Sequence, residues 1–414
     1  MKLFYMKRIF KKYKFVLAVH DIFYMIFFFV LSLIPSRRKL IVFECFGGRK
    51  YDDSPRYIYE KMIKDKSFDN FDFVWIFTNP DKFTIEKGVK VKKRSLKAYF
   101  YIIKAKCLVA NAGGMFVTCH FFKWNLMNKK QFYLNTWHGT PMKKIGGDQL
   151  KFLEGARDDF EKNSQVKLKR YGNISVVCAQ AKYDAQIFSR IFEVPYEKVL
   201  IEGLPRNDML ANVSDSDKMA MKNKLGLPDG KKVILYCPTW RDDEIDVNAN
   251  YSLKPPIDFN LWQSTLGNDY IILLRAHHNI KNMFLSEKND GFVRDFSSYE
   301  CLNDLFIASD IMISDYSSVY FDYSILGRPM LCFAYDYEKY MQGRGMYFDM
   351  KKELPCEAAS NEKDLLEQIV SLDYDTASQR AVEFRSKFVE AYGNATDACV
   401  KVIRDSIKER DSHI

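Results

Sequence analysis

Residues 39–46, KLIVFECF, decide the fold class, because they form a short, nearly continuous apolar run that ends at Gly47-Gly48. A strand buried on both faces has this pattern, since helices cover both sides of a parallel sheet. A helix is predicted directly after it, beginning at Ser54-Pro55 with Ser54 as the N-cap and Pro55 at the first helical position. Strand, turn and helix in this order form one unit of an α/β sheet.

The same alternation continues along the chain in two blocks. In the first block we expect further strands over residues 71–77, 107–111, 131–136 and 173–179, and helices over 95–104 and 184–191. After a polar stretch near 211–218, the second block has expected strands over 232–236, 270–275, 311–314 and 330–334, and helices over 299–308, 319–326 and beyond 365. The 414 residues therefore predict two doubly wound, Rossmann-like α/β domains, residues 37–212 and 213–414, that face each other across a cleft.

The first 36 residues have a different character. Residues 15–34 are mostly apolar, apart from His20 and Asp21, and basic residues flank them on both sides. Residues 1–40 carry nine Lys and Arg against one acid, and so hold most of the net charge of +10. The run is long enough to span a bilayer, but an Asp in hydrocarbon is costly. We expect residues 1–36 to form an apolar helix on an anionic membrane surface; the alternatives are a spanning helix and a core helix.

Several other classes of protein are disfavoured. Charge concentrated beside an apolar segment argues against a nucleic-acid partner. Nine cysteines without a C-x-x-C pair predict reduced thiols in a cytoplasmic protein. The P-loop, G-x-G-x-x-G and H-E-x-x-H signatures are absent, and both D-x-D pairs lie in polar connections. No set of residues in the sequence requires a metal or another cofactor. Whether the substrate binds together with Mg²⁺ is left open.

Residues 135–146, NTWHGTPMKKIG, are the first stretch with unusual chemistry. His138 stands just beyond a predicted strand, Gly139 lets the backbone approach a ligand closely, and Thr140-Pro141 resembles a helix start. An imidazole at this place can take a proton from a hydroxyl at neutral pH, and the alternative is a histidine that only caps a turn. Ligands of such sheets bind at the carboxyl ends of strands, which favours the functional interpretation.

A second stretch, residues 271–279, reads IILLRAHHN. A buried strand runs directly into Arg275 and His277, which share one side if the strand geometry continues. An arginine and a histidine that converge at a strand end suit a phosphate or diphosphate, and the alternative is a pair of ordinary surface residues.

A third stretch, residues 309–322, reads SDIMISDYSSVYFD. Ser317-Ser318 open a helix whose free N–H groups can bind an anion, unless a serine is only an N-cap. Asp322 either binds a ligand hydroxyl or is solvated. Two shorter stretches complete the set: YCPTWR at 236–241, and GLPRND at 203–208, where Arg206 can reach the cleft.

The motifs W-H-G-T-P-x-K-K, G-x-P-R-N-D, P-T-W-R, L-L-R-x-H and S-D-Y-S-S-x-x-x-D thus follow one another across residues 135–336. In this combination the sequence resembles the CDP-glycerol glycerophosphotransferase family over about residues 37–350. That family comprises teichoic-acid primases and polymerases of Gram-positive bacteria and related capsule enzymes. The resemblance implies a GT-B fold and a peripheral protein on the cytoplasmic face of the cell membrane.

The resemblance also implies a reaction. An acceptor hydroxyl attacks the phosphorus that bears glycerol in CDP-glycerol, and CMP leaves. Both motif histidines are essential in the family, so His138 is expected to be the base, while His277 and Arg275 neutralise the diphosphate. The positions that match the family's donor site are His138, Gly139, Thr140, Pro141, Met142, Arg206, Pro238, Thr239, Arg275, Ala276, His277, Ser317, Ser318 and Asp322.

Several alternatives stay open. CDP-ribitol is a second candidate donor, because related enzymes share these motifs. The acceptor is either a lipid-linked saccharide or a polyol phosphate, and the roughly 36 residues before the matching unit favour a primase or a short polymerase. A nucleotide-sugar glycosyltransferase of the same fold and a non-catalytic module for an anionic polymer are the less favoured readings.

Overall fold

The computed structural model describes residues 39–112, 131–153, 174–239, 241, 255–276 and 291–412, together with positions 22, 23, 26 and 30. Within these residues the chain forms two parallel sheets. The first contains β1 (Leu40–Glu44), β2 (Asp72–Phe77), β3 (Val89–Lys92), β4 (Cys107–Ala110), β5 (Phe132–Asn135), β6 (Val176–Ala179) and β7 (Val199–Ile201). The second contains β8 (Lys232–Cys237), β9 (Tyr270–Leu274), β10 (Val293–Asp295), β11 (Ile311–Ser314), β12 (Met330–Phe333) and β13 (Ala358–Ala359).

The two sheets have the same topology. Their strand orders are β3-β2-β1-β4-β5-β6-β7 and β10-β9-β8-β11-β12-β13, and each registered pair of strands is parallel. In both sheets the order reverses beside the first strand of the block, between β1 and β4 and between β8 and β11. Doubly wound sheets bind their ligands at such switch points, outside the carboxyl ends of the strands.

Helices cover both faces of the first sheet. They are α2 (Asp53–Met62), α3 (Leu96–Lys104), α4 (Gly146–Leu153), α6 (Lys182–Phe192) and the last helix, α15 (Ala395–Ser412). Alternate residues of β1 point to opposite faces. Leu40 and Val42 pack with α3 and α6 in one core, whereas Ile41 and Phe43 pack with α2 and α15 in the other. This explains why Leu40 to Phe43 of the predicted strand are all apolar.

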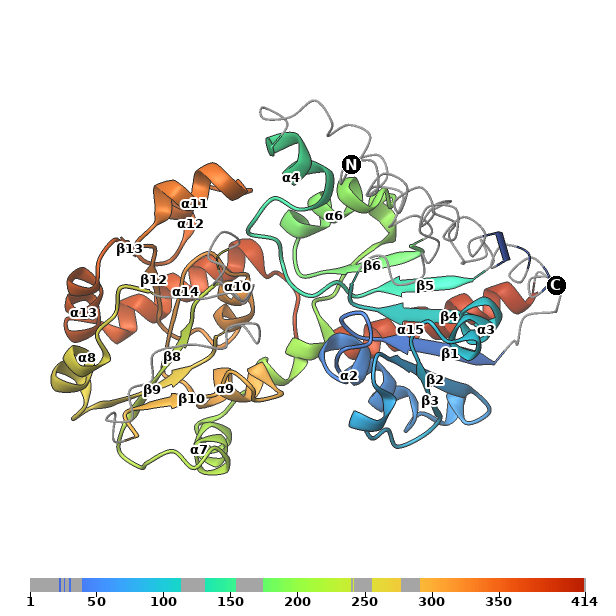
Figure 1. The fold of residues 1–414 in the computed structure, drawn as a ribbon, viewed down its shortest axis with the longest axis horizontal. Coiled ribbons are helices and arrows are strands. Elements are labelled where there is room, and N and C mark those ends of the chain that lie inside the picture. Colours follow the sequence, from blue (N-terminus) through green and yellow to red (C-terminus); the bar gives the residue numbers. More distant parts are fainter. Residues whose placement is uncertain are drawn as a thin grey trace, which may run out of the picture.

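The second sheet is built in the same way. Its helices are α7 (Asp215–Lys224), α8 (Phe259–Leu266), α9 (Leu302–Ala308), α10 (Val319–Ser324), α11 (Tyr337–Arg344), α12 (Met350–Glu353), α13 (Glu362–Val370) and α14 (Tyr374–Phe388). Val233 and Leu235 of β8 pack with α9, α10 and α14, while Ile234 and Tyr236 pack with α8 and α13. Figure 1 shows the two sheets as separate layered halves.

The chain crosses between the halves twice. It leaves the first half through the 3-10 helix η5 (Pro205–Leu210) and returns after α14. The last helix then packs against α2, and its Cys399, Val400 and Ile403 lie in a core of the first sheet (Figure 1). We had expected the closing helices to belong to residues 213–414; α13 and α14 do pack there, whereas α15 completes the first half. The boundary near residue 212 stays a prediction.

Three sequence expectations differ from the structure or fall outside it. Thr140-Pro141 does not begin a helix, because the first described helix after β5 is α4, which begins at Gly146. The first helix begins at Asp53 with Asp52 at its N-cap, so Ser54 lies inside the helix and is not the cap. The reason is Asp53, whose carboxylate accepts the Ser54 N–H at 2.6 Å and fixes the first turn. Most of the predicted membrane helix lies outside the described residues. Among the residues that are described, we find no helix with the length and apolarity to cross a membrane.

Candidate functional site

A cavity of about 870 Å³ opens between the two halves. Its volume is in the range of small-molecule sites. Residues that follow β1 and β5 line one wall, and residues that follow β8, β9, β10 and β11 line the other. Predicted site residues in the lining are His138, Gly139, Thr140, Pro141, Met142, Pro238, Thr239, Arg275, Ala276, Ser317 and Ser318. The structure therefore brings together residues that are up to 180 positions apart in the chain.

His138 is held in one tautomer on the first wall. Its Nδ1 lies 2.7 Å from the main-chain oxygen of Asn111, which follows β4. A carbonyl only accepts hydrogen bonds, so Nδ1 carries the proton and Nε2 keeps its lone pair. Burial lowers the pKa of His138 below 6.5, because the protonated ring loses its hydration. The neutral imidazole is thus the dominant form at pH 7, as a general base requires.

Two aromatic rings pack beside the His138 ring, and Asn111 also holds the loop that carries one of them. The Trp137 ring lies 4.2 Å from the His138 ring, and the Phe46 ring lies 5.6 Å from it on the loop after β1. Asn111 is fully buried, and its side-chain oxygen accepts the Phe46 N–H at 2.8 Å. Asn111 therefore links His138, the candidate general base, to the loop after β1. Sequence reasoning missed Asn111; its place at the end of a predicted strand was the available signal.

Gly139 and Ser318 meet where the two walls approach each other. Gly139 has φ +140°, and a Cβ atom added there would lie 3.0 Å from the Ser318 hydroxyl oxygen. Ser318 is the N-cap of α10, but its side chain makes no capping hydrogen bond. The hydroxyl is thus available to a ligand, and the simple N-cap reading of this serine does not hold.

Thr239 presents a second hydroxyl on the wall of the second half. Its N–H donates to Asp315 at 2.8 Å, which fixes the backbone after β8. Its buried Oγ1 has no hydrogen-bond partner among the described residues. Buried hydroxyls are nearly always paired, so this one is suited to a ligand atom.

Arg275 organises a loop as well as lining the cavity. Its Nη1 donates to the main-chain oxygens of Phe296, Ser297 and Tyr299 at 2.6–2.7 Å. These contacts hold residues 297–300, which also line the cavity. His277, the other half of the predicted phosphate pair, lies outside the described residues.

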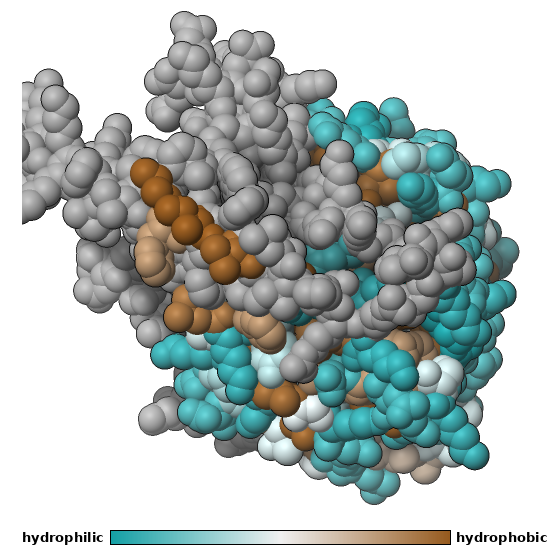
Figure 2. Space-filling model, turned by 90° about the vertical axis from the view of Figure 1, so that its right-hand side faces the viewer, coloured by the Kyte–Doolittle hydropathy of each residue, from teal (hydrophilic) through white to brown (hydrophobic). Residues whose placement is uncertain are grey.

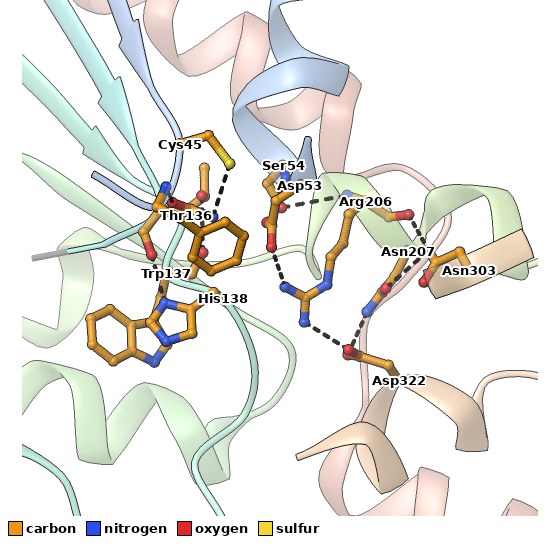
Figure 3. Close-up of polar contacts among 12 residues, drawn as sticks. Cys45, Asp53, Ser54, Thr136, Trp137, His138, Arg206, Asn207, Asn303 and Asp322 are labelled. Atoms are coloured by element: carbon orange, nitrogen blue, oxygen red, sulfur yellow. Dashed lines mark hydrogen bonds and ion pairs between the residues drawn. The ribbon is translucent and has the colours of Figure 1, made fainter. Parts of the chain in front are cut away.

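Arg206 and Asp322 lie beside the cavity and not in its lining. The guanidinium of Arg206 contacts Asp53 of α2 at 2.8 Å and Asp322 of α10 at 2.7 Å, so it joins the two halves (Figure 3). Asn207 also donates to Asp322 at 2.7 Å. Both carboxylates are buried, the Arg206 side chain is 13% exposed, and the two carboxylates raise the pKa of Arg206. Arg206 comes close to the cavity at Gly139, a lining residue. A Cβ atom added to Gly139 would lie 3.4 Å from Arg206 Nη2.

The described residues contain no group of three or more His, Cys, Asp or Glu side chains placed to hold a metal ion. Two Rossmann-like halves that share one cavity at their strand ends define a GT-B-like α/β protein. The chain belongs to the CDP-glycerol:poly(glycerophosphate) glycerophosphotransferase family, whose family model matches residues 26–404.

Relatives of known name support this assignment. The chain is 35% identical to a teichoic acid poly(glycerol phosphate) polymerase of Staphylococcus epidermidis over 90% of this chain and 51% of that protein. It is 33% identical to a teichoic acid glycerol-phosphate transferase of Staphylococcus aureus, covering 89% of this chain and 92% of that protein. The chain thus spans about half the length of the first relative and nearly all of the second.

A solved structure has the same fold. The wall teichoic acid polymerase TagF superposes with a TM-score of 0.82 at 33% sequence identity, over 96% of this chain and 98% of the solved one. A UDP-GlcNAc 2-epimerase from Neisseria meningitidis, 13% identical with a TM-score of 0.52, shares the fold alone; the match covers 89% of this chain and 99% of that structure.

Proposed function

We propose that this protein transfers glycerol phosphate from CDP-glycerol to a hydroxyl of a membrane-linked acceptor and releases CMP, in teichoic acid or capsule polymer synthesis. The observation that carries the proposal is His138, a neutral imidazole with an unprotonated Nε2 that lines a cavity shared by both halves. The family and the glycerol-phosphate relatives support the substrate class. A structure of TagF after a soak with CDPG supports the donor.

The proposed step is an in-line displacement at phosphorus. The acceptor oxygen forms a bond to the phosphorus that carries glycerol, and the bond from that phosphorus to the oxygen bridging to CMP breaks. His138 Nε2 takes the proton of the attacking hydroxyl, and CMP leaves with the electron pair of the broken bond. The Thr239 and Ser318 hydroxyls hydrogen-bond the diphosphate on the opposite wall.

For the remaining predicted residues we propose the same roles as we expected from the sequence. Arg275 and His277 neutralise the diphosphate, and direct binding of the donor by Arg206 and Asp322 stays a prediction. The place of Arg206 beside Gly139 supports a role close to the donor.

Glycerol is the favoured polyol. Glycerol-phosphate polymerases and a glycerol-phosphate transferase are 30–35% identical to this chain, two glycerol-phosphate primases are 26–27% identical, and two ribitol-phosphate polymerases are 24–25% identical. CDP-ribitol is the second candidate donor, and a nucleotide-sugar donor is the third.

The proposal is tested by supplying purified protein with a lipid-linked acceptor and one donor at a time. We expect CMP from CDP-glycerol at a rate at least tenfold above that from CDP-ribitol, and no UDP from UDP-sugars. Release of UDP, or absence of CMP with both CDP-polyols, contradicts the proposal. Thermal unfolding provides the control, because a donor that binds the folded state raises its midpoint whether or not it reacts.

We also propose that the amino-terminal helix holds the protein on the cytoplasmic face of the cell membrane. Four described helical residues, Ile22, Phe23, Ile26 and Val30, are 45–64% exposed, and three of them are spaced four residues apart. Figure 2 shows hydrophobic side chains exposed on this side of the molecule. An apolar helical face with basic neighbours in sequence suits an anionic lipid surface.

A further inference from the structure

We infer that the loop after β1, residues 46–52, binds a phosphodiester group of the acceptor through Arg49 and Lys50. The inference rests on the proposed function and names the chemistry of its second substrate. Both side chains line the same cavity as His138. They lie on the loop whose Phe46 ring contacts His138, so we place them on the side of the substrate whose hydroxyl is deprotonated.

The charges of the cavity lining favour an anion at this place. Among the described residues the lining contains four cations, Arg49, Lys50, Lys143 and Arg275, against the two acids Asp52 and Glu300. Two of the cations already have partners: Arg275 donates to main-chain oxygens, and Lys143 donates to a tyrosine hydroxyl at 3.1 Å. Arg49 and Lys50 make no hydrogen bond or ion pair within the described part of the chain.

Several contacts fix the backbone of this loop. Gly47 and Gly48 have φ of +68° and +80°, which glycine adopts without strain. The Gly48 main-chain oxygen accepts the Thr78 N–H at 2.6 Å, and the Lys93 ammonium donates to the Gly47 oxygen at 2.8 Å while it pairs with buried Glu44. The two cations therefore need little further ordering of the backbone when they bind a ligand.

The same loop is linked directly to the base. The Lys50 ammonium lies 5.7 Å from the centre of the Phe46 ring, and that ring lies 5.6 Å from His138. Phe46 is fixed through Asn111, which also orients the histidine. A chain end that places its hydroxyl at His138 therefore brings its nearest phosphodiester toward Arg49 and Lys50. Arginine forks and ammonium groups are the usual partners of such an anion.

The experiment compares two lipid-linked acceptors, one that ends in glycerol phosphate units and one that ends in a saccharide hydroxyl. We expect Arg49→Gln and Lys50→Gln each to raise the KM for the glycerol phosphate acceptor roughly tenfold or more. The KM for CDP-glycerol and the rate with the saccharide acceptor should change less than twofold. Arg49→Lys should restore part of the loss, because it restores the charge.

Lys363→Gln is the matched control, since Lys363 is an exposed lysine on α13, outside the cavity lining. Equal losses with both acceptors, or a raised KM for CDP-glycerol alone, overturn the inference and leave the proposed function standing. Loss of CMP release by unmodified protein with every acceptor overturns the proposed function instead.

A binding measurement keeps the inference testable without turnover. The probe is a soluble glycerol phosphate oligomer titrated into the full-length protein, with the salt concentration varied. We expect weaker binding by at least tenfold in the Arg49→Gln, Lys50→Gln double variant, together with a smaller salt dependence. Unchanged binding in that variant overturns the inference.

Discussion

His138 acts as a base in this account because of the atoms around it. The main-chain oxygen of Asn111 selects the tautomer, and burial keeps the ring neutral. The sequence predicted His138 from its place after a strand. It did not indicate Asn111, because that role depends on contacts with residues 27 and 65 positions away in the chain. Long-range pairing of this kind leaves no local pattern in a sequence.

The buried acid Glu44 leads to a prediction about how the stability of the fold depends on pH. It is buried at the end of β1, and burial raises its pKa from 4.5 to about 7 despite the ion pair with Lys93. An acid whose pKa is raised in the folded state stabilises the fold fully below pH 4.5, and this contribution is lost as the pH rises through 7.

We therefore expect the free energy of unfolding of Glu44→Gln, relative to the unmodified protein, to rise by roughly 3 kcal/mol between pH 5 and pH 8. Urea unfolding at a series of pH values measures it. Glu357→Gln, on the exposed surface, should stay within about 0.5 kcal/mol over the same range. A constant difference for Glu44→Gln, or a difference of opposite sign, contradicts this prediction.

At the scale of elements, the inner strands were predictable and most outer strands were not. The runs at 39–46 and 232–236 correspond to β1 and β8, which helices cover on both faces. The unpredicted strands β3, β10 and β13 lie at the edges of their sheets. They are two to four residues long, and β3 reads VKVK with exposed positions. Edge strands are short and partly solvated, so they lack a continuous apolar run.

The amino-terminal helix leads to a prediction about membrane binding. Removal of residues 1–35 should release the protein from anionic vesicles in a sedimentation assay, because the exposed apolar residues and six lysines and arginines leave with it. The truncated protein should still show a thermal shift with CDP-glycerol, since the cavity is built from later residues. Continued sedimentation of the truncated protein would place the membrane contact elsewhere.

At the scale of the whole molecule, the two halves are joined around one site. Two chain crossings, the packing of α15 on the first half, and the Arg206 contacts to Asp53 and Asp322 connect them. The sequence predicted two Rossmann-like units and eleven of the residues that line the cavity. The family resemblance placed Arg206 at the donor, which stays a prediction, and the structure adds its ion pairs with Asp53 and Asp322 across the junction. A lone arginine in a sequence does not reveal which carboxylates will surround it.

Charge is distributed unevenly between the amino-terminal segment and the cavity. Most of the net charge of +10 belongs to the first 40 residues, which we assign to the membrane surface. Within the cavity, we propose that anion binding depends on a few placed groups, namely Arg275 and the hydroxyls of Thr239 and Ser318 on one wall and Arg49 and Lys50 on the other.

The most direct test of the account is the rate of CMP release from CDP-glycerol, with a lipid-linked acceptor, by unmodified protein and by His138→Ala. We predict a loss of about 10²- to 10⁴-fold in kcat for the variant, the usual contribution of a general base. Its thermal shift with CDP-glycerol should remain, which shows an intact donor site. A variant that releases CMP as fast as the unmodified protein would contradict the central claim that His138 activates the acceptor.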